Sequence, residues 1–341
     1  MRSNTNRLFQ LFLLCCVFTF SATAQIIRPL TKHADAGFRG LDTYGERIVW
    51  VSGTKGTVGR STDRGKTWEW IGPKNFPEAD FRDIAVFGKD EAVIVSAGSP
   101  ALILKTVDAG KNWEEVYHNE DPEIFLNGMD FQGKHGFAIG DPIDGCFQLL
   151  ESKDRGKTWA DVSGSLLLFA EPGEVGFAAS GSGLQLLGDD LWVGSGGTFA
   201  AIFRRNEKKL LMYKMLTPIL SGAASQGIFS LNFWDNLNGI VVGGDYLNDA
   251  DNSHSVYMTN DGGENWIASE KPVGGYRSAV KYITKQKLVA TGTSGTDISN
   301  DGGKNWNTIS KDSYNVLGKS RSGKTIYLAG SNGQISVLDW K

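Results

Sequence analysis

Residues 61–68 read Ser-Thr-Asp-Arg-Gly-Lys-Thr-Trp, and the pattern Ser/Thr-x-Asp-x-Gly-x-Thr/Asn-Trp returns four more times along the chain. The five copies occupy residues 61–68, 106–113, 152–159, 259–266 and 299–306. In each copy the Asp can accept hydrogen bonds from turn amides, and the Gly supplies a positive φ that other residues resist. The Trp packs where the next strand begins. The pattern therefore predicts a recurring turn between two strands.

The spacing of these copies predicts a repeat fold. Their tryptophans stand at positions 68, 113, 159, 266 and 306, so the steps are 45, 46, 107 and 40 residues. A period of about 40–50 residues is typical of β-propeller blades, because each small sheet buries its faces against its neighbours. The long step therefore contains one blade that has lost the turn motif.

A second landmark gives the number of blades. Val/Ile-rich strands end in a glycine at seven places, namely Gly53, Gly98, Gly140, Gly194, Gly243, Gly292 and Gly330. The mean step between them is about 46 residues, an ordinary blade length. The sequence thus predicts an all-β fold with a single seven-bladed β-propeller, in which the blade at Gly194 lacks the motif.

The two ends of the chain predict export and ring closure. Residues 1–24 resemble a secretory signal peptide, with a basic start, an apolar run from Leu8 to Phe20 and a small-residue cleavage site at Ala22–Ala24. Residues 25–341 then form the propeller, without a membrane span in the mature chain, and the product is expected in the periplasm or secreted. Because the last blade supplies three strands, residues 25–30 should add the fourth, with Pro29 tolerated on a free edge.

Composition excludes several classes of function. The formal net charge is −3, which argues against general binding to nucleic acid. Cys146 is the one cysteine after residue 24, so no intrachain disulfide is expected in the mature chain. The four histidines are scattered without metal-ligand spacing, and no phosphate-cradling glycine loop is visible, so we expect neither a metal nor a cofactor.

The repeated aspartates are interpreted as structural. They are Asp63, Asp108, Asp154, Asp261 and Asp301. A residue that chemistry needs once would not recur at the same turn position in five blades. These turns should lie between the third and fourth strands of each blade, on the lower face, away from the usual binding surface.

Arginines at the start of the innermost strands are the first candidates for a binding site. Counting back about 15 residues from each landmark glycine reaches Phe38-Arg39, Phe81-Arg82, Phe125-Leu126, Val175-Gly176, Ile228-Phe229, Tyr276-Arg277 and Tyr314-Asn315. Innermost strands line the central channel and begin at the upper face. Arg39, Arg82 and Arg277 could therefore form one cationic patch that binds a carboxylate, a phosphate or an acidic segment. Alternatively, each arginine pairs with a nearby carboxylate such as Asp42, Asp80 or Asp83.

Two long hairpins on the same face supply further candidates. They span residues 140–145 and 245–254, and they carry Asp141, Asp245 and Tyr246. Loops on a rigid scaffold are frequent sites of recognition. The competing interpretation is that these acidic loops are merely solvated.

The eight-residue motif is that of the Asp-box, or BNR, repeat. The order of strand, glycine, hairpin and motif across seven blades resembles the photosystem II stability and assembly factor family of exported propellers. This resemblance covers nearly the whole mature chain. It implies a binding scaffold, with Arg39, Arg82 and Arg277 contacting a protein partner.

Two functions of different classes remain open. The first is an exported, non-enzymatic module that binds a protein partner or acidic segment through its upper face. The second is a glycoside hydrolase acting on a carbohydrate, either sialidase-like or using a carboxylate pair such as Asp141 with Asp245, which would have to lie within roughly 5–9.5 Å of each other. A sialidase-like site also needs three arginines around a carboxylate. An oxidoreductase is a weaker third alternative, since no cofactor motif supports it.

Overall fold

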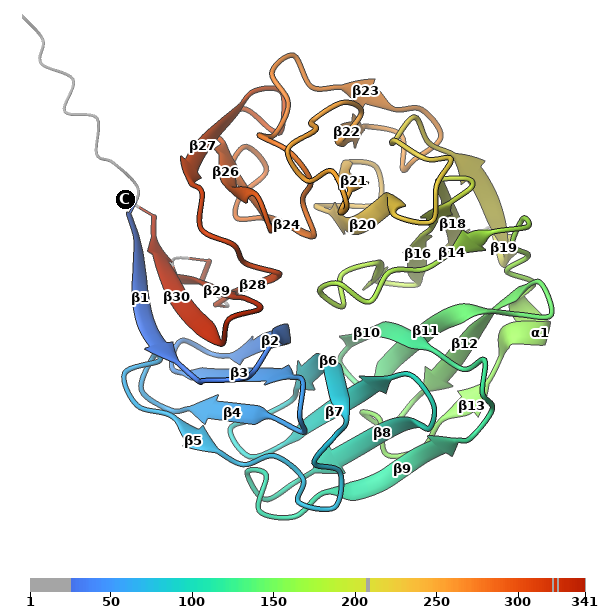
Figure 1. The fold of residues 1–341 in the computed structure, drawn as a ribbon. Helices are drawn as coiled ribbons and strands as arrows, with labels where there is room; N and C mark the ends of the chain where they lie inside the picture. The colour runs from blue at the N-terminus through green and yellow to red at the C-terminus, as the bar shows by residue number, and fades with distance from the viewer. Residues whose placement is uncertain (1–25, 207–208, 321, 324, 341) are drawn as a thin grey trace, which may run out of the picture.

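The computed structural model describes residues 26–206, 209–320, 322–323 and 325–340. Its strands form seven sheets arranged radially around one axis (Figure 1), which confirms the seven-bladed propeller. The predicted signal peptide, residues 1–24, and Gln25 lie outside the described residues. Among the described residues, no helix has the length and apolarity needed to cross a bilayer.

Blades one to three are four-stranded antiparallel sheets with consecutive strand order. Blade one holds β2 (Phe38–Tyr44), β3 (Ile48–Gly53), β4 (Val58–Ser61) and β5 (Glu69–Trp70). Blade two holds β6 (Asp80–Val86), β7 (Ala92–Ala97), β8 (Ala101–Thr106) and β9 (Glu114–Asn119). Blade three holds β10 (Leu126–Gln132), β11 (His135–Ile143), β12 (Cys146–Ser152) and β13 (Ala160–Asp161), and it is followed by the short helix α1 (Ser163–Leu166).

Blades four, five and seven vary this plan, whereas blade six follows it. Blade four holds β15 (Leu184–Leu187), β16 (Asp190–Gly194), β18 (Ala201–Asn206) and β19 (Lys209–Leu216). Blade five holds β20 (Gln226–Phe233), β21 (Gly239–Asp245), β22 (Val256–Thr259) and β23 (Ile267–Ala268), extended by β14 (Glu174–Val175) and β17 (Gly196–Gly197). Blade six holds β24 (Ala279–Tyr282), β25 (Leu288–Gly292), β26 (Gly295–Ser299) and β27 (Trp306–Ser310). Blade seven holds β28 (Val316–Lys319), β29 (Thr325–Ala329), β30 (Gln334–Asp339) and β1 (Ile26–Lys32).

Ring closure occurs as predicted. The N-terminal strand β1 pairs antiparallel with β30 and becomes the outermost strand of blade seven. Pro29 lies where the register of this pair shifts, on the free edge of the sheet. A cluster that includes Phe38, Val51, Ile335 and Val337 then packs blade one against blade seven. The two ends of the chain therefore meet in one blade (Figure 1).

The repeated motif folds as a hydrogen-bonded turn between the third and fourth strands of its blade. In the first copy, Gly65 N–H donates to Ser61 Oγ at 2.8 Å, and Ser61 Oγ donates to Asp63 Oδ1 at 2.9 Å. The Thr67 N–H donates to the same Asp63 oxygen at 2.9 Å. The same three bonds recur in the other four copies. The structural interpretation of the five aspartates is thus supported by contacts within each turn.

Blade four departs from the expected layout. The repeat count places Val175-Gly176 at the start of its innermost strand, but this strand is β15, which begins at Leu184. Val175 instead belongs to β14, which pairs with β17 beside blade five. The placement from sequence is therefore wrong for this blade, because an inserted segment, residues 176–183, separates β14 from β15.

Carboxylates on the innermost strands join neighbouring blades. Asp42 of blade one accepts a hydrogen bond from Val86 N–H of blade two at 2.8 Å. Asp83 of blade two accepts one from Met129 N–H of blade three at 2.8 Å, and also one from Ile84 N–H at 2.8 Å. Burial raises the pKa of Asp83 to about 8, although both hydrogen bonds favour the charged form.

The raised pKa of Asp83 makes stability depend on pH. Because the folded pKa of about 8 exceeds the ordinary value near 3.9, the folded state holds this proton more tightly than the unfolded chain does. The contribution is complete below about pH 4 and is lost as the pH rises through about 8, at up to about 1.4 kcal/mol per pH unit. Urea unfolding between pH 5 and pH 8.5 measures this loss.

Asp83→Asn should flatten this decline, whereas Asp189→Asn, in an exposed turn of blade four, should leave it unchanged. The readout is the difference in slope between each variant and the wild type, since other carboxylates contribute slopes of their own. Equal slopes for the wild type and Asp83→Asn would contradict the assignment.

Candidate functional site

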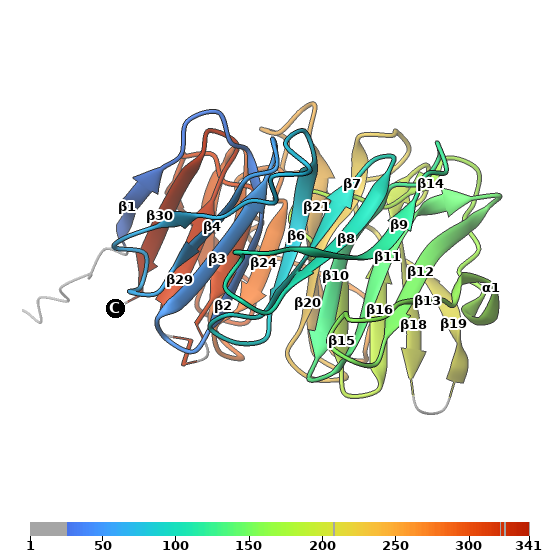
Figure 2. The same cartoon turned by 90° about the horizontal axis from the view of Figure 1, so that it is seen from below.

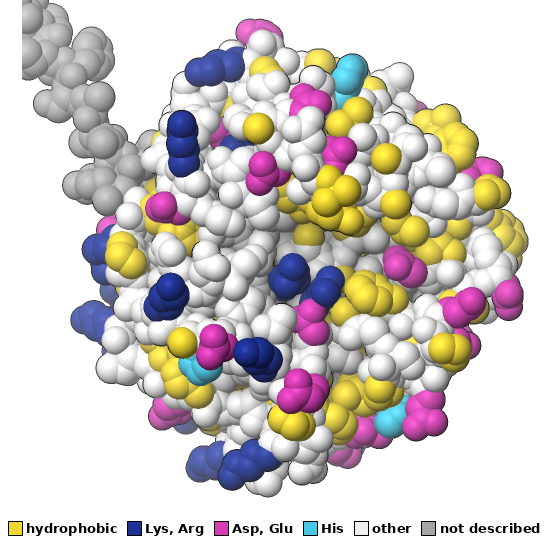
Figure 3. All heavy atoms as spheres, viewed as in Figure 1, with side chains coloured by type: hydrophobic (Ala, Val, Ile, Leu, Met, Phe, Trp, Pro, Cys, Tyr) yellow, Lys and Arg dark blue, Asp and Glu magenta, His cyan; other side chains and the backbone are white. Residues whose placement is uncertain are grey.

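The upper face is the face at which the innermost strands begin, and it faces the viewer in Figure 1. In the space-filling view the centre of this face is hollow, with basic side chains on one side of the hollow and an apolar area on the other (Figure 3). Arg39 at the start of β2 and Arg82 at the start of β6 belong to this mouth of the channel. Figure 2 shows the opposite, lower face at the bottom, where β18 ends and β19 begins.

Arg82 is held in place by three groups. Its Nε donates to Asp80 Oδ2 at 2.7 Å, and its guanidinium lies over the ring of Phe125 at 5.5 Å from the centroid. Its Nη1 reaches the carbonyl oxygen of Ala178 at 3.4 Å. The ion pair with Asp80 matches the structural alternative from sequence, yet 26% of the Arg82 side chain stays exposed. The guanidinium is thus oriented and still accessible.

Arg39 is half-buried and lies close to Arg82, Asp80 and Tyr276. It forms neither an ion pair nor a hydrogen bond with any residue that the structure describes. Burial, and then the charge of Arg82, lower the pKa of Arg39. A cation held beside another cation without an anionic partner of its own favours binding of an anionic group.

Arg277 does not join this pair at the surface. Its side chain is fully buried, its Nε donates to Asp297 Oδ2 at 2.6 Å, and its Nη1 donates to Tyr276 O at 2.7 Å. Of the three arginines predicted to form one patch, Arg39 and Arg82 lie at the mouth, whereas Arg277 is buried. The inward turn of Arg277 follows from Asp297, which stands on β26 of the same blade.

Aromatic side chains form the other side of the mouth. Phe177 stacks on Phe229 with ring centroids 3.8 Å apart, and Phe229 meets Tyr276 edge to face at 4.7 Å. Tyr246, which is 48% exposed, approaches Phe229 at 6.1 Å. The register explains this wall, because Ile228 pairs with Gly243 as Phe38 pairs with Gly53, so Phe229 takes the place of Arg39. The sequence indicates this wall through the dipeptide Ile228-Phe229, which has an aromatic residue at the position that Arg39 takes in blade one.

The two acidic loop residues are engaged within the fold. Asp141 accepts hydrogen bonds from Asn127 Nδ2 and Gly176 N–H, both at 2.9 Å, and burial raises its pKa. Asp245 accepts hydrogen bonds from Gln226 Nε2 at 3.1 Å and Leu247 N–H at 2.9 Å. Asp141 thus joins its hairpin to β10 and to the segment that begins at Gly176, and Asp245 is bonded to β20 and to its own loop. Whether they also contact a ligand stays a prediction.

The channel is crossed below this mouth by the inserted residues 176–183, here called the plug. Ser180 Oγ donates to Ser278 O of blade six at 2.7 Å, and the Ser182 hydroxyl lies 2.7 Å from that of Ser230 in blade five. On the other side, a Cβ at Gly181, whose φ is +70°, would overlap the Asp83 carboxylate of blade two. A glycine is required there because the plug backbone touches this side chain. The upper mouth is therefore a blind depression.

The motif aspartates lie away from this mouth. Hydrogen bonds from Thr67 hold the pKa of Asp63 down to about 2, which keeps it charged as an acceptor for its turn. In the described part of the chain, no group of His, Cys, Asp and Glu side chains is placed to hold a metal ion. Cys146 is a free thiol.

Residues 78–185 match the family model described as photosynthesis system II assembly factor YCF48. The resemblance to this family is confirmed. The matched segment runs from the entry to blade two through the plug to the start of β15. No curated protein matches the chain.

Solved YCF48 structures have the same fold. A structure described as YCF48 bound to a D1 peptide is 15% identical with a TM-score of 0.67, and the alignment covers 94% of this chain and 96% of that one. YCF48 from Cyanidioschyzon merolae is 16% identical with a TM-score of 0.63, over 93% and 99% of the two chains. The WD40 propeller domain of Doa1 is 11% identical with a TM-score of 0.63, over 93% and 98%. At these identities the likeness establishes the fold.

Substitution should distinguish Arg277, which is paired with Asp297, from Arg39, which has no ion pair among the described residues. Arg277→Ala leaves the carboxylate of Asp297 buried without its cation, so we expect a loss of about 3–5 kcal/mol in the free energy of unfolding. Arg39→Ala should cost less than about 1 kcal/mol. Urea unfolding at pH 7 measures both. Similar small losses for the two variants would contradict the structural role of Arg277.

Proposed function

We propose that this propeller is an exported, non-enzymatic binding module that holds a segment of a partner protein in its upper mouth. The observation that carries the proposal is the arrangement of two guanidinium groups opposite an aromatic wall. Arg39 and Arg82 offer donors to carboxylates, and Phe177 and Tyr246 offer apolar surface within the same depression, backed by the buried ring of Tyr276.

This arrangement favours a peptide over a folded acidic surface. Arginine and aromatic residues are the side chains that most often dominate binding energy at interfaces. The plug closes the depression from below, so a bound segment would enter and leave through the same face. The partner segment should therefore combine an acidic group with a neighbouring aromatic or large apolar side chain.

The solved YCF48 that is bound to a D1 peptide supports a peptide-binding role for the fold. The match of residues 78–185 to the YCF48 family model supports the same class of function. Burial of Arg277 against Asp297 weighs against the sialidase-like alternative, since Arg277 cannot join Arg39 and Arg82 around a substrate carboxylate.

Peptide binding tests the proposal. Fluorescence anisotropy with labelled peptides that carry Glu beside Phe or Tyr should show binding to the wild type that weakens as salt increases. Arg39→Ala together with Arg82→Ala should weaken it at least about tenfold, or about 1.4 kcal/mol. Arg47→Ala, which removes an exposed charge from the lower β2–β3 turn, is the matched control and should leave binding unchanged.

Two results of the peptide-binding test would contradict the proposal. One is equal binding by the double variant and the wild type. The other is equal binding of peptides in which Lys replaces Glu.

Export is part of the same proposal. The basic start, apolar run and small-residue site within residues 1–24 support cleavage after Ala24 and a periplasmic or secreted product. Mass spectrometry of the protein isolated from cells should find Gln25 at the N-terminus. A chain that keeps residues 1–24 would argue against cleavage.

A further inference from the structure

A second hollow, here called the lower pocket, fills the channel beneath the plug. Its volume is about 570 Å³, within the range of small-molecule sites. Ser180, Gly181 and Ser182 of the plug form its closed end, and Tyr44 and Gly133, at the lower ends of innermost strands, lie at the other end. It therefore opens on the face opposite the proposed peptide site.

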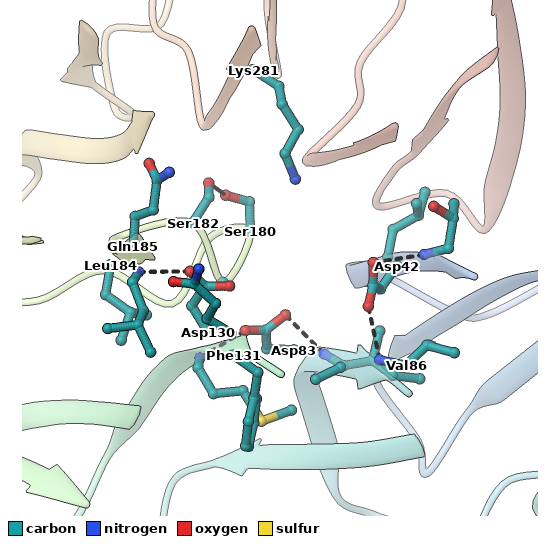
Figure 4. Close-up of a pocket in the computed structure, with 18 of the residues that line it drawn as sticks. Asp42, Asp83, Val86, Asp130, Phe131, Ser180, Ser182, Leu184, Gln185 and Lys281 are labelled. Carbon is teal, nitrogen blue, oxygen red and sulfur yellow. Dashed lines mark hydrogen bonds between the residues drawn. The ribbon is translucent and has the colours of Figure 1, made fainter. Parts of the chain in front are cut away.

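The lower pocket has opposite charges on opposite walls. The charged acidic wall consists of Asp42 of blade one and Asp130 of blade three, beside Asp83 of blade two, whose raised pKa of about 8 leaves it mostly uncharged at neutral pH. Lys281 of β24 reaches in from blade six (Figure 4). The positive charge of Lys281 lowers the pKa of Asp42 and of Asp130, although burial outweighs it and raises both. The pocket is thus dipolar.

Lys281 is the polar group on these walls that the fold leaves without a partner. Its ammonium points into the hollow (Figure 4), and it makes neither a hydrogen bond nor an ion pair with the residues that the structure describes. The neighbouring cations do have partners. Lys319 Nζ donates to Tyr282 O at 3.1 Å, and Arg155 forms an ion pair with Glu91 at 3.4 Å.

The other polar groups on the walls are held by the fold. Asp130 accepts a hydrogen bond from Leu186 N–H at 2.7 Å, and Asn232 accepts one from Tyr282 N–H at 2.8 Å. Gln185 accepts one from Phe233 N–H at 2.6 Å. The acidic wall is therefore fixed in place, while each carboxylate oxygen can accept further hydrogen bonds.

We propose that the lower pocket binds a small zwitterion of the amino acid or short peptide class. The carboxylate of this ligand contacts Lys281, and its ammonium group lies beside Asp130 and Asp42. A ligand that carries only one sign of charge would be attracted to one wall of the pocket and repelled by the other. Partly exposed apolar side chains, Phe87, Phe131 and Leu187, complete the lining and accommodate the uncharged part of the ligand.

Calorimetry with three probes tests this charge pattern. Triglycine carries both charges, N-acetylglycine the negative one alone, and glycinamide the positive one alone. At pH 7.5 the full chain should bind triglycine at least about tenfold more tightly than either singly charged probe. Glycinamide binding as tight as triglycine would identify the pocket as a simple cation site and overturn the proposal.

Variants assign the binding to this pocket. Lys281→Met and Asp130→Asn should each weaken triglycine binding at least about tenfold, and Lys281→Gln serves if the Met variant does not fold. Lys285→Met, at an exposed lysine outside the lower pocket, is the control and should bind like the wild type. No triglycine binding by the wild type, or equal binding by Lys281→Met, would also overturn the proposal. Peptide binding at the upper mouth should be unaffected by Lys281→Met, so the two proposals fail separately.

Discussion

Every blade of this ring buries its faces against two neighbours, and the pairing of β1 with β30 is the interaction that lets the last blade do so. Without β1, the outer edge of blade seven would lack its fourth strand, and the ring would depend on packing alone. Clusters lie on either side of blade one: Phe38 and Val51 pack toward blade seven, while Trp50 shares a cluster with Phe81 of blade two. Such contacts between sheets are the main stabilising term of the fold.

Within the closed ring, polar contacts near the axis join neighbouring blades in addition to the apolar layers. Side chains of innermost strands accept backbone N–H groups from the next blade, as Asp42, Asp83 and Asp130 do. Burial raises the pKa of all three carboxylates, to about 6 for Asp130 and to about 8 for Asp83, while the hydrogen bonds from the backbone favour their charged forms. The same residues line the lower pocket, where their positions are set by bonds to the backbone.

The plug divides the channel into two environments of different character. Above it, Arg39 and Arg82 face aromatic rings, and below it, carboxylates face Lys281. This division arises from one insertion in the blade that lost the turn motif. Blade four lacks a long innermost strand, and residues 176–183 occupy the space where that strand would begin. Irregularity in one blade thus gives a symmetric scaffold two distinct hollows.

The turn motif and the blade count were predictable from sequence, because they depend on residues close together in the chain and on a regular spacing. Ring closure was predictable because that spacing leaves the last blade one strand short. Hydrogen bonds within residues 61–67 form in the same way wherever the pattern occurs. The burial of Arg277 was not predictable, since its partner Asp297 lies 20 residues away on another strand. The plug and the dipolar lower pocket also required the folded chain. Both depend on contacts between one loop and blades two, three, five and six. The spacing of residues in the sequence does not give distances across the axis.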